Sequence, residues 1–462
     1  MIQRSDSGAL QYRFNETLDS YFSELGVESV CGIAIAYSGG LDSSALLKLA
    51  VEYCRLRAIP LFAIHIHHGL SPNADSWLEY CRSVCLSQDV TFFYEKVTLD
   101  GTKKDGIESS ARRARYLALG RICHEHQINF CLTAHHQDDQ AETLLMQMLR
   151  GSGVAGLSGM DRFNTAENLL GVSTLTLMRP LLQEARGNLE RFVESHDVLH
   201  IHDESNDDAR FLRNALRHKV MPLLEEISPG FSLRVARTAI HMKSTRILLE
   251  DIAEQDFRVC ADNDGLSLQS IRLLSSERVN NLLRLWFTKL RSRVPTTSRL
   301  AEICKQLFEA RDDARVTVFH DNLAIHRYQG RIYATSRRDA QDQSDKSVIF
   351  RWTGQGTIEF PEMGGALYFL KSDLGVDSEW LNNQSLEIHF RRGGERIKLA
   401  ENRPTRDMKS HYQSLKIPFW VRQKLPFVSI GDHLLFAAGV GMQSSFCSYG
   451  NGDKISFEWV AG

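Results

Sequence analysis

The sequence lacks long hydrophobic runs, and no stretch of its 462 residues approaches the ~18 consecutive apolar residues of a membrane span. Its first residues, MIQRSDSGALQYRFNETL, lack the uninterrupted apolar core of a secretory signal peptide. Hydrophobic residues make up 43% and charged residues 24% of the chain, which is ordinary globular usage and excludes a disordered or collagenous protein. We therefore expect a soluble, cytoplasmic protein that does not interact with a membrane.

An excess of basic residues is also missing, because 55 Lys and Arg stand against 57 Asp and Glu, a formal net charge of −2. Any binding to nucleic acid must therefore come from a local patch of charge. No C-x-x-C pair occurs among the nine cysteines, and the closest two are Cys81 and Cys85. This usage favours reduced thiols over a disulfide framework or a zinc site.

The first ~220 residues alternate between buried strands and helices. Apolar runs occur at residues 31–37, 61–67, 90–97 and 128–134, with helical patterns around 74–88 and 108–125. This alternation predicts right-handed βαβ units and a parallel sheet. In such sheets ligands bind at the carboxyl ends of the strands, and the segments SGGLDS and TAHHQDD both fall there.

The rest of the chain follows two other patterns, and at ~150 residues per domain the length predicts about three domains. Helical periodicity dominates residues 233–310 and is followed by short alternating segments, whereas strand-like segments after residue 348 surround a helix near 406–416. The polar stretch 336–347 reads as a linker. We predict an α/β catalytic domain at 1–225, a mostly helical middle domain at 226–336 and a small α+β domain at 348–462.

A glycine-rich loop lies between the first predicted strand and its helix, with the sequence Ser38-Gly39-Gly40-Leu41-Asp42-Ser43. Two glycines allow a tight turn that presents backbone amides, and the positive end of the following helix suits a phosphate. A carboxylate such as Asp42 would repel phosphates unless it holds Mg²⁺ or a positive group. The Walker pattern is absent, so this is not an ordinary P-loop. The alternative without a ligand is a capped helix after a glycine turn.

Two further segments carry charged residues at helical spacing. Glu108, Arg112 and Arg115 share one helix face, although a solvated ion-pair face is an equal alternative. In the segment HHQDDQAET (135–143), Asp139 and Glu142 lie three residues apart and hence side by side. Paired carboxylates in a cleft suit a cationic ligand or Mg²⁺. The apolar residues that follow, at 144, 145, 148 and 149, predict the buried stripe of this helix.

Basic residues gather in two later segments. Arg210, Arg213 and Arg217 follow the motif Asp203-Glu-Ser205-Asn206 along a predicted helix, ready for phosphate or nucleic acid, although an amphipathic surface helix would explain two of them. Between residues 385 and 425, ten Lys and Arg against four acidic residues give a local charge of +6. This patch suits a phosphate backbone.

In this order the motifs are similar to those of the tRNA(Ile)-lysidine synthetase family, PP-loop (N-type) ATP pyrophosphatases, in its long three-domain form. The resemblance is dense over residues ~30–225 and continues in Arg391-Arg392-Gly393-Gly394-Glu395-Arg396 and Pro418-Phe419-Trp420. Family members commonly have Trp directly after Pro, so Phe419 is a departure that concerns only the detail of docking.

The resemblance implies an enzyme that uses ATP and Mg²⁺ to join free L-lysine to the 2-position of the wobble cytidine in the CAU anticodon of tRNA(Ile). The resemblance implies that the reaction passes through an adenylated cytidine and releases AMP and pyrophosphate. It also implies that the modified tRNA reads the codon AUA instead of AUG. It assigns ATP to Ser38, Gly39, Gly40, Leu41, Asp42, Ser43 and His135; Mg²⁺ to Asp42 and Asp139; catalysis to Asp42, Arg112, Arg115, Asp139, Glu142 and Arg213; and tRNA to Arg391, Arg392, Arg396, Lys409, Trp420 and Lys424.

Several alternatives remain open at this point. Spacing does not decide which of Arg112 and Arg115 contacts the α-phosphate. A tRNA thiolase on the same fold also adenylates a base, but it needs catalytic cysteines or a cysteine-held cluster near the ATP. The four cysteines Cys81, Cys85, Cys123 and Cys131 are scattered, and none adjoins SGGLDS. A non-catalytic RNA-binding protein with a relic nucleotide loop is the alternative of a different class.

Overall fold

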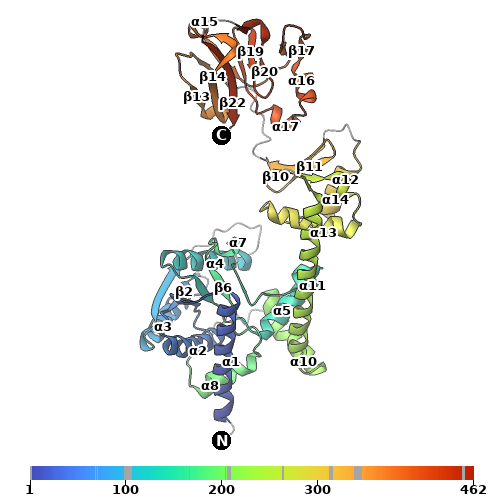
Figure 1. Ribbon diagram of the computed structural model, residues 1–462. Helices are drawn as coiled ribbons and strands as arrows, with labels where there is room; N and C mark the ends of the chain where they lie inside the picture. The colour runs from blue at the N-terminus through green and yellow to red at the C-terminus, as the bar shows by residue number, and fades with distance from the viewer. Residues whose placement is uncertain are drawn as a thin grey trace. The chain divides into compact units, whose positions relative to one another are not determined.

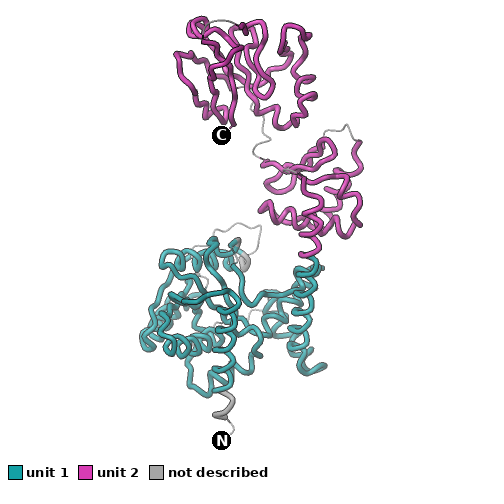
Figure 2. The backbone as a smooth tube through the Cα atoms, viewed as in Figure 1, with its two compact units in different colours: residues 1–249 teal, residues 250–462 magenta. Residues whose placement is uncertain are grey.

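The computed structural model (Figure 1) describes residues 3–67, 69, 71–97, 107–165, 167–202, 204, 210–262, 265–311, 316–337, 346–449 and 453–461. The chain forms two compact units, residues 1–249 and 250–462 (Figure 2). Asp203, Ser205 and Asn206 of the predicted motif, and most of the predicted linker, lie outside the described residues. None of the helices in the described ranges is long and apolar enough to cross a membrane.

A six-stranded, mostly parallel sheet forms the centre of the first unit, in the order β3-β2-β1-β4-β6-β5. Only the edge pair β5–β6 is antiparallel. The strands are β1 (Ile33–Ala36), β2 (Leu61–His67), β3 (Thr91–Lys96), β4 (Phe130–Leu132), β5 (Phe163–Asn164) and β6 (Thr176–Met178). The first four confirm the strands predicted from the apolar runs, which are continuous because helices cover both faces of the sheet.

Helices cover the two faces with separate hydrophobic clusters. One cluster joins the sheet to α1, α2, α3 and α8, and the other joins it to α4 and α7. The helices of this unit are α1 (Gln3–Glu24), α2 (Leu41–Arg57), α3 (Ala74–Ser87), α4 (Ile107–Glu125), α5 (Gln137–Leu149), α6 (Val154–Leu157), α7 (Glu167–Leu170) and α8 (Arg186–Ser195).

The order of the strands creates the crevice that positions the site. Strand β1 pairs with β2 on one side and with β4 on the other, so the chain reverses its direction across the sheet between β1 and β4. Ligands bind at such switch points, outside the carboxyl ends of the strands. The loop 37–40 follows β1 and the segment 133–136 follows β4, so both predicted motifs reach the same crevice.

After this fold the chain continues through short helices into one long helix. These are α9 (Leu212–Ala215), a π-helical turn η2 (Leu216–Val220), α10 (Met221–Ile227) and α11 (Phe231–Cys260). Turns of π-helix are rare and occur frequently at functional sites. The π-turn here contains Arg217 and His218, both of which reach the cavity described below.

The second unit contains three hydrophobic clusters, the smallest of which joins Ile397, Met408, Tyr412, Phe427 and Ala437. The first lies between α13 (Ser276–Lys289), α14 (Thr297–Phe308) and a five-stranded antiparallel sheet, so the predicted helical middle region also holds a sheet. Its elements further include α12 (Leu268–Ile271), β7 (Ala261–Asp262), β8 (Gly265–Ser267), β9 (Val316–His320), β10 (Leu323–Tyr328) and β11 (Arg331–Ser336).

The second core of this unit lies between antiparallel sheets, in orders β12-β15-β18-β19-β20 and β13-β14-β21 with β22 paired to β14. The strands are β12 (Ser347–Phe350), β13 (Thr357–Phe360), β14 (Gly365–Asp377), β15 (Leu386–His389), β16 (Arg396–Ile397), β17 (Arg406–Asp407), β18 (Phe427–Ile430), β19 (His433–Ala437), β20 (Gly441–Met442), β21 (Ser448–Tyr449) and β22 (Lys454–Ala461). Three short helices, α15 (Ser378–Asn382), α16 (Met408–Ser414) and α17 (Phe419–Arg422), complete it.

Candidate active site

The glycine-rich loop is held from beneath by a distant part of the chain. Gly39 has φ of +84°, and a Cβ there would lie 2.6 Å from Cδ1 of Ile201 and 2.8 Å from Sγ of Cys81. The amide of Ile201 donates to the carbonyl oxygen of Gly39 at 2.8 Å. The hydroxyls of Ser38 and Ser43 lie 3.0 Å apart and close the loop from within. Glycine at position 39 is thus required by both conformation and packing.

A cavity of about 490 Å³ opens above this loop, within the usual range for a nucleotide or drug-sized ligand. It brings together most of the predicted site. The predicted residues that line it are Ser38, Gly40, Leu41, Asp42, Ser43, Arg112, Arg115, His135 and Asp139. Gly39, Glu142 and Arg213 are not among the residues that line it.

Both predicted arginines of α4 reach this cavity. The guanidinium of Arg112 lies 5.0 Å from the ring centroid of Tyr116 and is partly buried, whereas Arg115 is exposed. Both side chains therefore remain candidates for the phosphate.

The paired carboxylates Asp139 and Glu142 hold two arginines rather than standing free. Arg213 donates from Nε to Glu142 at 2.8 Å and from Nη2 to Asp139 at 2.7 Å. Arg217 donates from Nε to Glu142 at 2.6 Å and from Nη2 to Asp139 at 3.0 Å. The side chain of Glu142 is only 1% exposed, so its charge depends on these partners. We call these four residues the ion cluster.

The ion cluster changes the acidity of its members. Burial alone would raise the pKa of Asp139, but the charges of His136, Arg213 and the other cations near it hold that pKa well below its usual range. Burial likewise opposes the positive charges of Arg213 and Arg217, whereas the two carboxylates raise the pKa of both guanidinium groups. Asp139 is therefore ionised, and the two arginines stay protonated, throughout the physiological range.

His136, which belongs to the predicted segment HHQDDQAET but was assigned no role, connects the loop to the ion cluster. Its Nε2 lies 3.6 Å from Asp42 and 3.3 Å from Asp139, and its backbone amide donates to Asp139 at 3.0 Å. Burial would lower the pKa of this imidazole, but the carboxylates of Asp139, Asp42 and Asp138 raise it above its ordinary value. A partly cationic His136 would neutralise the acidic side of the cavity.

The neighbouring His135 is in the opposite state. Burial lowers its pKa to about 3, so the imidazole is neutral at physiological pH. Its Nδ1 lies 2.8 Å from the hydroxyl of Thr133. A neutral imidazole that lines the cavity can exchange hydrogen bonds with a nucleotide without adding charge.

Asp42 provides the test of whether Mg²⁺ would fit. Its Oδ1 is buried without a hydrogen-bond partner in the described part of the chain, and its side chain is 29% exposed. In the described ranges, no group of three or more His, Cys, Asp or Glu is arranged to hold a metal by itself. Mg²⁺ often takes one or two carboxylates, with phosphates and waters as its other ligands, so a carboxylate with one unpartnered oxygen beside a phosphate loop fits it.

The expectation that no cysteine adjoins the glycine-rich loop was wrong. Cys81 does lie against the loop, because α3 packs beneath it and brings Sγ under Gly39. Burial raises the pKa of this thiol to about 12, with a smaller effect from Cys85. The thiol is therefore protonated and inert. No cysteine is among the residues that line the cavity.

The predicted tRNA contacts of the second unit fall into two groups. Exposed basic residues form the first, and these are Arg391, Arg392, Arg396, Lys409 and Lys424. Trp420 differs, because its indole is partly buried against the rings of His326, Tyr328 and Tyr333. Arg422 of the basic segment is buried and donates from Nε to the carbonyl oxygen of Ile417 at 2.8 Å, so it supports the fold.

A phosphate loop at the switch point of a parallel sheet, with arginines and carboxylates around one cavity, defines a PP-loop ATP-binding enzyme. The family model of the PP-loop domain matches residues 10–224, that of the TilS substrate binding domain 266–333 and that of the TilS substrate C-terminal domain 386–459. The chain belongs to the tRNA(Ile)-lysidine synthase family, whose members are ATP-dependent ligases.

Two curated relatives illustrate the similarity. The tRNA(Ile)-lysidine synthase of Ralstonia nicotianae is 35% identical over 437 residues, which cover 92% of each chain. That of Burkholderia pseudomallei is 36% identical over 442 residues and 89% of each chain. Among solved structures, a U34-tRNA thiolase from Methanococcus maripaludis is 18% identical with a TM-score of 0.42, over 52% of this chain and 80% of that one.

Proposed function

We propose that this chain joins the amine of free L-lysine to the 2-position of the wobble cytidine in the CAU anticodon of tRNA(Ile). The 2-oxygen of cytosine attacks the α-phosphate of ATP and releases pyrophosphate, and the lysine amine then displaces AMP from the adenylated base to give lysidine. The tRNA would thereafter read AUA instead of AUG. The observation that carries this proposal is that one cavity is lined by the phosphate loop, by both arginines of α4 and by Asp139 and Arg217 of the ion cluster, in a chain of this family.

Each side chain has a role that its chemistry supports. The loop from Ser38 to Ser43 would bind phosphates through backbone amides, and Asp42 would hold Mg²⁺, which neutralises phosphate charge. Arg112 or Arg115 would stabilise the charge that develops on the α-phosphate, since a guanidinium binds phosphate in a fork and stays charged. Neutral His135 would contact the nucleotide.

Asp139 and Glu142 are our candidates for the contacts of substrate lysine, and Asp139 also for Mg²⁺. Because Arg213 and Arg217 already pair with both carboxylates, a lysine cation would have to share or replace a guanidinium there. Arg213 would otherwise approach the base or the phosphate. We also propose that the chain forms three domains, at 1–225, 226–336 and 348–462, the last of which offers its exposed basic residues to the tRNA.

Incorporation of labelled lysine tests the proposal. Purified protein with ATP, Mg²⁺ and a CAU isoleucine tRNA transcript should retain label on the tRNA, whereas a transcript with uridine at the wobble position should not. Asp42→Asn is the matched inactive variant. Retention of no label despite tRNA binding would remove lysine as the substrate and favour thiolation. Absence of ATP–pyrophosphate exchange as well would favour the non-catalytic alternative.

A further inference from the structure

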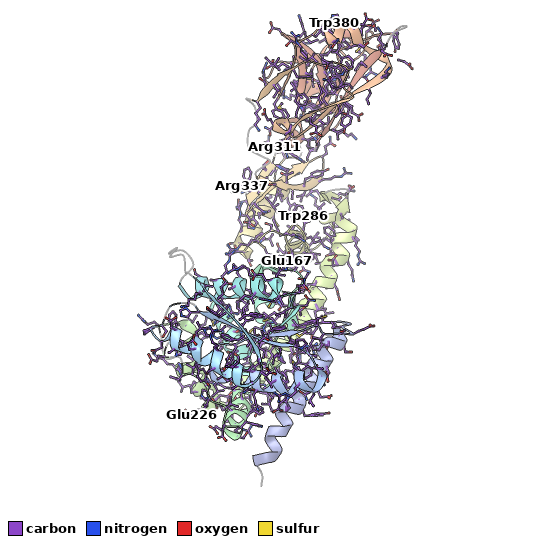
Figure 3. The ribbon with its side chains drawn as sticks, turned by 90° about the vertical axis from the view of Figure 1, so that its left-hand side faces the viewer. Glu167, Glu226, Trp286, Arg311, Arg337 and Trp380 are labelled. Carbon is purple, nitrogen blue, oxygen red and sulfur yellow. The ribbon has the colours of Figure 1, made fainter. Side chains whose placement is uncertain are left out.

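Trp77 differs from the other tryptophans of the chain. Five of the six have a ring partner, in the pairs Trp286–Phe287, Trp352–Phe369, Trp380–Phe446, Trp420–His326 and Trp459–Phe360. Trp286 on α13 and Trp380 on α15 are labelled in Figure 3. Trp77 has no ring contact within the described ranges, remains partly exposed and lines the catalytic cavity. A large aromatic face is thus left available where a ligand would bind.

The backbone of Trp77 is held firmly at the rim of this cavity. It lies in the first turn of α3, where its amide donates to the carbonyl oxygen of Asn73 at 3.0 Å. Asp75 attaches the same turn to the sheet, since its Oδ1 accepts from Lys96 at 2.7 Å and lies 3.3 Å from Nε2 of His67. Lys96 and His67 occupy the carboxyl ends of β3 and β2. The backbone that carries the indole is therefore ordered as part of α3 before a ligand arrives.

The rest of the cavity indicates which ligand would use an aromatic face. The phosphate loop and the two arginines of α4 line the same cavity, so a bound nucleotide would have its phosphates held by polar groups. Its base needs a flat apolar contact, and indole stacking binds every base because each has a π-face. The other five tryptophans pack against rings of this chain, whereas Trp77 has no ring partner among the described residues, so no aromatic neighbour occupies its face.

We propose that Trp77 stacks on a nucleobase bound in the catalytic cavity. Two nucleobases would enter it, the adenine of ATP and the wobble base of the tRNA. The inference rests on the proposed function only in that these are its two substrates. Base stacking on an aromatic side chain corresponds to ~5- to 150-fold in affinity on substitution by alanine.

The test uses Trp77→Ala and Trp77→Phe in the full chain, with Trp380→Ala as the matched control for loss of a partly exposed indole. Equilibrium dialysis of a non-hydrolysable ATP analogue measures the adenine arm. Filter binding of CAU tRNA, with and without an abasic wobble position, measures the tRNA arm. Neither binding measurement depends on the incorporation of lysine. Failure of the proposed function would therefore be seen separately, in the lysine-incorporation assay with the wild-type protein.

We expect Trp77→Ala to weaken one arm ~10-fold or more, whereas Trp77→Phe stays within ~3-fold of wild type and Trp380→Ala is neutral in the adenine arm. A loss of affinity for the ATP analogue identifies adenine as the base that stacks on Trp77. Loss in the tRNA arm that disappears with the abasic tRNA identifies the wobble base. Ligand quenching of tryptophan fluorescence that is absent from Trp77→Phe supports stacking even if the alanine variant unfolds. Affinities within 2-fold of wild type in both arms, with quenching retained in Trp77→Phe, overturn the proposal.

Discussion

The indole of Trp420 lies parallel to the imidazole of His326, with ring centroids 4.2 Å apart and planes inclined by 12°. The hydroxyl of Tyr328 adds a hydrogen bond to the carbonyl oxygen of Ile417 at 3.3 Å. The segment 417–420 thus packs against strands β10 and β11 within the second unit. The family resemblance assigns Trp420 to tRNA binding, whereas this contact gives it a role in packing. The two roles can be separated by experiment.

Trp420→Ala should lower the free energy of unfolding of the second unit by about 2–4 kcal/mol, because it empties a contact with three rings. Thermal and urea unfolding measure this loss. Trp380→Ala, at a site where the side chain is 37% exposed, is the control and should cost less. Unchanged unfolding together with weaker tRNA binding would show that Trp420 acts on the tRNA instead.

His326 predicts a pH dependence of stability. Burial lowers its pKa to about 4, while its two ring nitrogens lie 3.0 Å from Thr317 Oγ1 and 2.8 Å from Thr335 Oγ1. The unfolded chain takes up a proton near pH 6.5 that the folded chain refuses until about pH 4. Stability should therefore fall as pH drops through this window, by up to ~1.4 kcal/mol per pH unit.

Urea unfolding at pH 7, 5.5 and 4.5 measures this slope, and His326→Gln is the variant that isolates it. The glutamine side chain retains hydrogen-bonding groups but does not titrate. We expect a shallower slope in the variant, with the difference confined to the range between about 4 and 6.5. Equal slopes in the two proteins would assign the pH dependence to other groups.

Glu142→Gln tests the ion cluster. The change keeps the shape of a side chain that is 1% exposed but leaves Arg213 and Arg217 with Asp139 as their one carboxylate in the cluster, and we expect a loss of about 3–5 kcal/mol. Glu190→Gln is the control, because the exposed pair Arg186–Glu190 contributes ~0.5 kcal/mol or less. A stable variant with only a raised KM for lysine would limit Glu142 to substrate binding.

Gly39→Ala should abolish ATP binding and destabilise the first unit. The new Cβ would meet Ile201 at 2.6 Å in a backbone conformation with φ of +84° that alanine disfavours. Gly187→Ala, within α8 and with no atom within 4 Å of its Cβ position, is the control and should be neutral or slightly stabilising. Normal nucleotide affinity in the position-39 variant would contradict the packing argument.

The sequence predicts what is local in this site and misses what is distant. Asp139 and Glu142 were expected to lie together because three residues along a helix bring side chains to one face. Their partner Arg217 lies 75 residues after Glu142 in the sequence. The spacing of residues along one helix does not indicate which distant segment will pack against it. The partner of Trp420 is likewise unpredictable, because Trp420 lies on helix α17 and His326 on strand β10, far apart in the sequence.

The buried stripe predicted for α5 was wrong in its second half. Leu144 is buried as expected, but Met148 is 61% exposed and Leu149 66% exposed. The buried face of this helix is occupied instead by polar site residues such as Asp139 and Glu142. Hydrophobic periodicity assumes that buried positions are apolar, and that assumption fails where a helix builds a charged site.

The parallel bridge between Gly40 and Ile201 has a consequence for synthesis on the ribosome. The loop leaves the exit tunnel early, but the residue that supports it follows about 160 residues later. At ~5–20 residues per second, that interval is on the order of 10–30 s. Throughout it the nascent chain carries its glycine-rich loop without this contact, so we expect competence to bind nucleotide to arise only after Ile201 has been translated, late in the synthesis of the first unit.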